Sequence, residues 1–240
     1  MKAEFKGKNK ELFTIAYGAE ESPVMAVLLQ PFPWEMERLS WTYKQLSKRL
    51  SRLNILVVNF HYQNTGDSEG KSEDFTIEQS QTDLENLISQ YNKEKIILLG
   101  TSLGANVALK YNPDPRVLAR IAIDPITDGI EYLKQKRASH REYLAEPSFE
   151  PPFLGNKNLD GQLLGFQLKP QLEEELKALT ISNATTDKIF YTQPPSHTLE
   201  NAKIIAEDKP LWTRWSKMNF SHFSHRTIKV VVDEVKEVLS

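Results

Sequence analysis

Residues 95–109 read Lys-Ile-Ile-Leu-Leu-Gly-Thr-Ser-Leu-Gly-Ala-Asn-Val-Ala-Leu, and this stretch decides the fold. Its first part, Lys95–Leu99, is a continuous apolar run after the lysine, which is typical of a strand buried on both faces of a parallel sheet. Its last part, Gly104–Leu109, consists mainly of small and apolar residues and predicts a helix. The residues between them can form only a short connection. The stretch therefore predicts a strand, a tight turn and a helix in immediate succession.

Strands and helices alternate on both sides of this stretch. Helical spacing of apolar residues occurs at Met36–Leu53 and at Ile77–Tyr91. Such alternation predicts an α/β fold with a doubly wound, mostly parallel sheet. The strands expected in the first half are Leu12–Tyr17, Val24–Gln30, Asn54–His61, Lys95–Gly100 and Val117–Asp124.

The alternation stops over residues 126–187 and then resumes. This segment starts with a polar helix, Ile130–Ala145, and ends with a helix near Pro170–Leu179. Because it interrupts one continuing pattern, we expect residues 1–125 and 188–240 to form the core and residues 126–187 to be a lid or cap insertion. The elements expected after it are a strand Lys188–Thr192, a helix around His197–Ala206, a strand near Leu211–Met218 and a helix Arg226–Leu239.

The composition excludes several classes of protein. The 240 residues carry a formal net charge of −2, so no basic field is available to attract nucleic acid. Cys is absent, which excludes disulfides, thiolate metal sites and cysteine nucleophiles. The charged N-terminus does not resemble a secretory signal, and no apolar run approaches the ~18 residues that span a bilayer. We therefore expect a cytoplasmic protein without a membrane span. The reaction expected below needs a small-molecule acyl substrate and requires no metal or cofactor.

Ser102 is the candidate nucleophile. Residues 100–104 fit the pattern G-x-S-x-G, in which a serine stands on a sharp turn between a strand and a helix. The alternative is a serine that is only structural at a tight turn. A helix that begins at Leu103 directs its first N–H groups at the reacting centre, so the Leu103 amide is expected to form half of an oxyanion hole. For the other half, Phe32 is the available donor, because the flanking Pro31 and Pro33 lack an N–H. This loop could alternatively be merely rigid.

These motifs resemble the α/β-hydrolase superfamily. Within it, the chain is similar to the exosortase-associated, serine aminopeptidase-like hydrolases. That group carries a His-Pro-Phe-x-Glu-Glu-Met loop, which residues 30–36 follow except at Gln30 and Trp34. Its Gly-x-Gly-Asp-Ser-x-Gly turn matches residues 64–70 except at Asn64, and its Pro-x-x-x-Gly and aromatic-Leu pattern matches residues 125–133. The resemblance implies a hydrolase fold, but the acid usual after the penultimate strand is missing, and no carboxylate follows until Glu200.

A serine nucleophile needs a histidine base, and the sequence offers five histidines. The superfamily keeps its histidine just before the last helix, where His222 and His225 lie. His222 is the first choice, because it is expected in the loop and Phe223 forms a His-Phe pair common in such hydrolases. His225 is the alternative. Ser224 is a good N-cap, which would place His225 on the first turn of the helix.

Asp124 is the strongest candidate for the acid. It ends the strand after the nucleophile's own, and Ala-Ile-Asp-Pro at residues 122–125 resembles the Gly-Leu-Asp-Pro motif of the pancreatic-lipase family. The alternative is that Asp124 caps the following helix, with Asp128 or Glu200 as the acid. Asp67 is expected to close the turn after His61.

The resemblance and these residues predict a serine hydrolase for a carboxylic ester or thioester. An inactive binding or scaffold protein with a hydrolase fold, and an acyltransferase with the same triad, remain alternatives. The aromatic residues of the insertion, Tyr132 among them, are expected to pack against the core and are not assigned to the site. The sequence does not determine the acyl chain length or the oligomeric state.

Overall fold

The computed structural model of the chain describes residues 1–111, 114–145, 161–181, 188–192, 199, 202–205 and 225–240. Within these residues, one eight-stranded sheet has the order β1-β2-β4-β3-β5-β6-β9-β10. β2 is antiparallel to β1 and to β4, and the remaining neighbours are parallel. The strands are β1 (Lys2–Lys6), β2 (Leu12–Tyr17), β3 (Val24–Leu29), β4 (Leu56–Phe60), β5 (Lys95–Thr101), β6 (Val117–Ile123), β9 (Lys188–Tyr191) and β10 (Lys203–Ile204).

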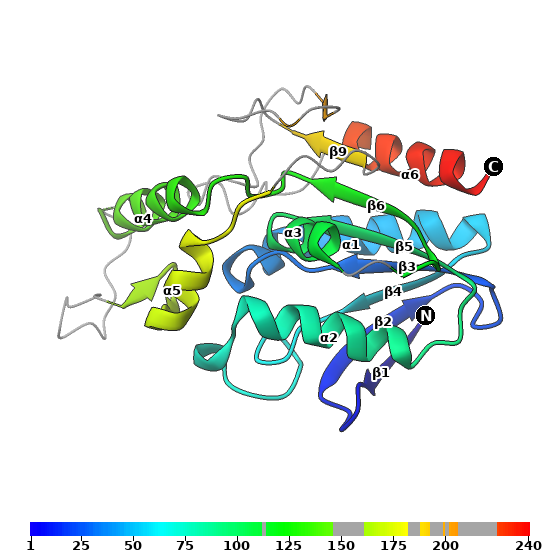
Figure 1. Cartoon of the computed structure of the whole chain (residues 1–240), viewed down its shortest axis with the longest axis horizontal. Helices are drawn as coiled ribbons and strands as arrows, with labels where there is room; N and C mark the ends of the chain where they lie inside the picture. Colours follow the sequence, from blue (N-terminus) through cyan, green and yellow to red (C-terminus); the bar gives the residue numbers. More distant parts are fainter. Residues whose placement is uncertain (112–113, 146–160, 182–187, 193–198, 200–201, 206–224) are drawn as a thin grey trace.

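Helices cover both faces of this sheet (Figure 1). The helices α1 (Pro33–Leu50) and α6 (His225–Leu239) pack on one face, and α2 (Ile77–Ser89) and α3 (Leu103–Lys110) pack on the other. None of the helices in the described residues is long and apolar enough to cross a bilayer. The doubly wound, mostly parallel sheet predicted from the alternating pattern is confirmed.

β3 shows why the apolar runs were a reliable signal. Its side chains alternate between the two faces, as the pleat of any strand requires. Met25, Val27 and Leu29 enter the core that contains α2 and α3, whereas Ala26 and Leu28 enter the core that contains α1 and α6. All five are fully buried. A strand with two buried faces has no solvent-facing position, so its sequence is apolar throughout.

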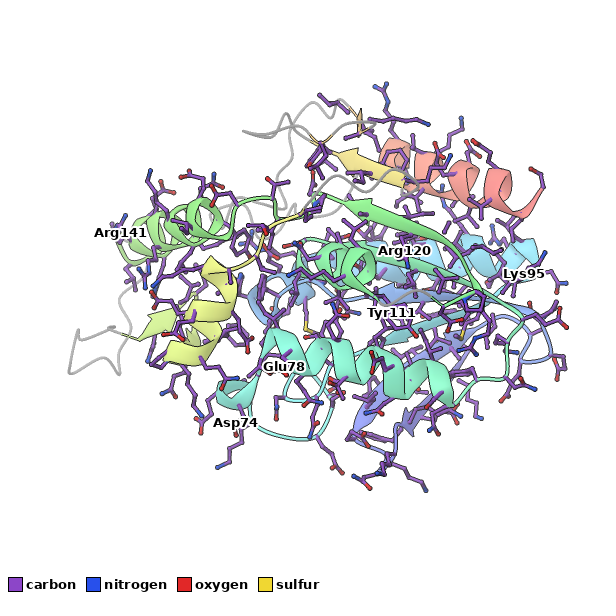
Figure 2. The ribbon with its side chains drawn as sticks, in the orientation of Figure 1. Asp74, Glu78, Lys95, Tyr111, Arg120 and Arg141 are labelled. Carbon is purple, nitrogen blue, oxygen red and sulfur yellow. The ribbon has the colours of Figure 1, made fainter. Side chains whose placement is uncertain are left out.

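The segment 126–187 contributes α4 (Gly129–Ala145), the hairpin β7 (Gln162–Leu163) and β8 (Phe166–Gln167), and α5 (Pro170–Lys177). Leu133 of α4 and Leu172 and Leu176 of α5 join the same apolar core as α2 and α3. α4 and α5 lie together beyond the end of the sheet toward which β6 and β9 point (Figure 1). Lys95 at the amino end of β5 and Arg141 of α4 accordingly lie on opposite sides of the view (Figure 2).

One local prediction needs correction, and the structure adds two elements that the sequence did not indicate. The helix expected around His197–Ala206 is wrong at Lys203–Ile204, which form β10 beside β9. The edge strand β1 was not expected, because its sequence Lys-Ala-Glu-Phe-Lys lacks a buried face. The hairpin β7–β8 was also missed; it turns at Leu164 and Gly165, whose φ angles of 51° and 89° suit a two-residue loop. The strand expected near Leu211–Met218 lies outside the described residues.

A buried carboxyl group anchors α2 to the loop after β4. Asp83 of α2 is fully buried and accepts hydrogen bonds from the Gln63 N–H at 2.7 Å and from Gln79 Nε2 at 2.8 Å. Burial is the main cause that raises the pKa of Asp83 from 3.8 to about 6. The folded state therefore favours the protonated acid, and this contribution is complete below pH 3.8 and is lost as the pH rises toward 6.

We predict that Asp83→Asn gains stability relative to the wild type as the pH rises from 4 to 7. A difference of about 2 pKa units corresponds to roughly 3 kcal/mol in the free energy of unfolding. Urea unfolding of both proteins at several pH values measures this difference. Asp74→Asn is the control, because the Lys169 ammonium lowers the pKa of Asp74, so that the contribution of Asp74 changes little above pH 4. An equal stability difference at pH 4 and pH 7 would contradict the prediction for Asp83.

Candidate active site

Ser102 stands on the sharp turn between β5 and α3. Its backbone angles are φ 53° and ψ −121°, a sparsely populated conformation for a residue with a side chain. Its N–H donates to the Ile123 carbonyl at 3.0 Å, and its own carbonyl accepts from Ala105 at 3.0 Å and Asn106 at 3.2 Å. These bonds to β6 and α3 hold the strained residue in place. Strain that the surrounding structure maintains in this way is characteristic of functional positions.

The two glycines of the motif are required by close backbone contacts. A Cβ atom on Gly100 would lie 2.1 Å from the Gly104 carbonyl group, and one on Gly104 would lie 2.1 Å from the Leu29 oxygen. Real Cβ atoms do not approach other atoms so closely. α3 can therefore start immediately against β5 and against the end of β3 only because both side chains are absent. The same contacts place the segment that follows Leu29 next to the turn at Ser102.

Phe32 and Leu103, the expected oxyanion donors, lie at the starts of two helices. Leu103 is the first residue of α3, so its N–H has no acceptor within the helix. Phe32 is the N-cap residue of α1, and its carbonyl accepts from Glu35 at 2.8 Å and Met36 at 3.1 Å. Since Gly104 packs on Leu29 and Gln30, both helix starts lie at the same edge of the sheet.

Asp124 lies beside Ser102 at the carboxyl end of the neighbouring strand, one residue beyond the paired Thr101 and Ile123. Its φ angle is 46°, and its N–H donates to the Phe190 carbonyl at 2.8 Å. One carboxylate oxygen accepts from the Thr192 N–H at 2.7 Å and the other from the Thr192 hydroxyl at 2.5 Å. These bonds fix the direction of the carboxylate against β9.

The helix-capping role considered for Asp124 belongs to Asp128. The Asp128 carboxylate accepts from the Glu131 N–H at 2.9 Å, which is the bond of an N-cap side chain at the start of α4. The interpretation of Asp124 as the cap of the following helix is therefore wrong. Glu200, the other fallback acid, lies outside the described residues.

The first-choice base, His222, also lies outside the described residues, as does His197. His225 is the exposed first residue of α6; its Nδ1 lies 3.3 Å from Arg49 Nη2, and its ring is 6.2 Å from that of Trp41. In the described part of the chain, no contact joins His225 to Ser102 or Asp124. His61 accepts a hydrogen bond from the Asp67 N–H at 3.0 Å, so Asp67 does close the turn after His61.

The structure adds a buried polar cluster that the sequence did not indicate as part of the site. Tyr132 of α4 donates to Glu35 Oε1 at 3.0 Å and accepts from Trp34 Nε1 at 3.0 Å. Lys136, one turn further along α4, forms an ion pair of 2.7 Å with the same Glu35 oxygen. A sequence signal existed: Glu35 lies three residues after Phe32, and Tyr132 and Lys136 share the i, i+4 spacing of one helix face.

Tyr132 brings this cluster to the nucleophile. Burial raises the pKa of Tyr132 well above 10, and the Glu35 carboxylate raises it further, so the phenol remains protonated. The Ser102 hydroxyl is among the groups that lower this pKa, which makes the two hydroxyls neighbours. Their geometry falls short of a hydrogen bond, and the buried Ser102 Oγ has no partner among the described residues. The nucleophile's hydroxyl is therefore not committed to any described group.

No cluster of metal ligands occurs in the described part of the chain. No three His, Cys, Asp or Glu side chains gather there as metal ligands do. A hollow of about 560 Å³ lies along β7, β8 and the start of α5, between Gly161 and Lys177. Its lining includes none of Phe32, Ser102 or Asp124, so we do not assign it to the reaction.

Known structures resemble the chain over its whole length, although no protein-family model and no curated protein matches its sequence. The alpha/beta hydrolase domain-containing protein 10 from mouse is 14% identical over 100% of both chains, with a TM-score of 0.61. A carboxylesterase structure from the thaumarchaeon Nitrososphaera gargenis is 14% identical over 98% of both chains, with a TM-score of 0.60. Identities this low establish architecture alone. The chain therefore has the α/β-hydrolase fold.

Proposed function

We propose that the protein is a serine hydrolase that cleaves a carboxylic ester or thioester. The observation that carries the proposal is Ser102 itself, a strained residue at a strand–helix turn with a hydroxyl that no described group binds. A structural serine at such a turn would be expected to use its hydroxyl as a cap, and Ser102 makes no side-chain cap bond with α3. The hydrolase-fold relatives support the same reading.

The proposed reaction proceeds through an acyl-enzyme. His222 takes the proton from Ser102 as the oxygen attacks the substrate carbonyl, and the Phe32 and Leu103 amides stabilise the negative oxygen that forms. His222 then gives its proton to the leaving alcohol or thiol. Water, deprotonated by the same histidine, releases the acid and restores Ser102. Asp124 orients His222 and stabilises its cation.

We further propose that residues 126–187 cover this site as a lid or cap. The contacts of Tyr132 and Lys136 with Glu35 support this assignment, because they place α4 over the loop that carries Phe32. A covered site would exclude water from the reacting groups and strengthen electrostatic interactions. An acyltransferase would use the same residues, with an alcohol or amine in place of water.

An inactive scaffold protein is the alternative from another class. Gln30 stands where the resembling group has histidine, and its buried side chain donates to Asn59 of β4. This bond joins the ends of β3 and β4. The glutamine therefore has a structural role, and its presence in place of histidine does not argue against catalysis. The missing carboxylate after β9 is compensated in our proposal by Asp124, which Thr192 of that same connection holds in place.

For the proposed nucleophile, we predict that a fluorophosphonate probe labels the wild-type protein and does not label Ser102→Ala. Ser47→Ala is the matched control, because Ser47 is also buried with an unpartnered hydroxyl, on α1 away from any turn. His222→Ala should slow labelling by roughly 10³-fold or more, because the base that takes the proton from Ser102 is lost. His225→Ala should label normally. If the well-folded wild-type protein takes up no probe, the serine-hydrolase hypothesis fails and an inactive scaffold protein is favoured.

Another prediction concerns Asp124 as the acid of the proposed triad. Asp124→Asn should lower kcat for p-nitrophenyl acetate by roughly 10²- to 10⁴-fold, because the amide selects the wrong histidine tautomer. Asp128→Asn should leave kcat unchanged, since asparagine caps a helix as well as aspartate does. Steady-state kinetics of both variants, with their melting temperatures, test the assignment. Equal kcat values for Asp124→Asn and Asp128→Asn would remove Asp124 from the triad.

A further inference from the structure

The first helix of the segment 126–187 is tied to the loop of Phe32 by one group of side chains. We name this group the Glu35 cluster; it comprises Trp34, Glu35, Tyr132 and Lys136. Trp34 and Glu35 come from the start of α1, and Tyr132 and Lys136 come from α4, almost one hundred residues later. Three polar contacts of 2.7–3.0 Å join the two sides.

Burial makes this connection rigid. The Glu35 side chain is 3% exposed and that of Lys136 is 11% exposed. A carboxylate withdrawn from water is tolerated when an opposite charge and hydrogen bonds compensate it, and here Lys136 and Tyr132 supply both at Oε1. Arg38, which is buried on α1, is a second cation near Glu35. Because loss of Lys136 would remove the ion-pair partner of a buried carboxylate, the position of α4 constrains the position of Glu35.

Glu35 in turn fixes Phe32. The Glu35 N–H donates to the Phe32 carbonyl at 2.8 Å. The Phe32 ring stacks on Trp34, with centroids 4.6 Å apart and planes 7° apart, and lies 5.5 Å from the Tyr132 ring. Proline on either side of Phe32 restricts the backbone further. The Phe32 ring is therefore held by Trp34 and Tyr132 of the Glu35 cluster, and its carbonyl is held by the first backbone N–H groups of α1.

We infer that Lys136 and Glu35 are positioning residues of the active site, which hold the Phe32 amide in its place opposite the Leu103 amide. This inference rests on the proposed acyl transfer at Ser102. In this inference α4 supports the oxyanion hole by holding the Phe32 amide, in addition to its proposed role of covering the active site. Neither residue touches the substrate; both act through Phe32.

A displaced oxyanion donor has a characteristic kinetic effect. Its hydrogen bond forms with the charge that develops in the transition state, so its loss lowers kcat and leaves KM almost unchanged. Lys136→Met should therefore lower kcat for p-nitrophenyl acetate by about 10- to 100-fold. The inhibition constant of a trifluoromethyl ketone, which forms an oxyanion on Ser102, should rise by the same factor. Lys136→Arg retains the cation and should restore most of kcat.

Lys134→Met is the matched control. Lys134 lies on the same helix, its side chain is 77% exposed, and its ion pair with Glu131 is a surface contact of 3.5 Å. The double variant Glu35→Gln with Lys136→Met limits the risk of misfolding, because it removes both charges of the buried ion pair together. We expect it to fold, as thermal unfolding would show, and to keep the low kcat, because α4 no longer holds Phe32 through the ion pair.

The outcomes separate the inference from the function on which it rests. If the wild type hydrolyses no ester and takes up no fluorophosphonate, the proposed function fails. If the wild type is active, three results overturn the inference alone. These are a kcat of Lys136→Met equal to that of Lys134→Met, a wild-type kcat in the double variant, or a rise in KM at constant kcat, which would indicate a substrate contact.

Discussion

The close approach of three backbone segments at Gly100 and Gly104 is the constraint on which the rest of the structure depends. Gly100 lets α3 start directly against β5, and Gly104 lets α3 contact the carbonyls of Leu29 and Gln30. Any side chain at either position would force these segments apart, because its Cβ atom would lie 2.1 Å from backbone atoms. Because they stay in contact, the strained Ser102, the start of α3 and the loop after β3 meet at one edge of the sheet. The proposed chemistry needs that meeting, since a nucleophile and two amide donors must face one carbonyl group.

A second constraint acts on the same place from outside the sheet. Glu35 is a buried carboxylate, and its compensation by Lys136 and Tyr132 requires α4 to lie over the loop of Phe32. The hydrolase core could form its elbow without this contact, but the Phe32 amide would then be held only by its flanking prolines, the first turn of α1 and the stacking on Trp34. In our proposal, backbone packing brings the reacting groups together, and the buried ion pair orients the Phe32 amide. In our proposal the insertion serves the reaction as well as covering it.

Most of the fold could be predicted because its signals are local. Strands buried on both faces are apolar throughout, so β3, β4, β5 and β6 were recognised within one or two residues of their ends. The failures occurred where local sequence carries no such signal. β1 is an edge strand of alternating charge, β10 has two residues, and the β7–β8 turn places a leucine at positive φ. In each case pairing with another strand decides the conformation, and the sequence of the strand itself does not reveal this pairing.

By itself, the sequence determined the alternation of strands and helices and the position of Ser102 between two glycines that no larger residue could replace. It also placed Asp124 at the end of the neighbouring strand. Tertiary structure alone decided which aspartate caps α4 and which faces Thr192, because the two lie four residues apart in similar local sequence. It also decided that Glu35, Tyr132 and Lys136 belong together. Their contacts join residues about one hundred positions apart, and a buried charge finds its partner only when the chain has folded around it.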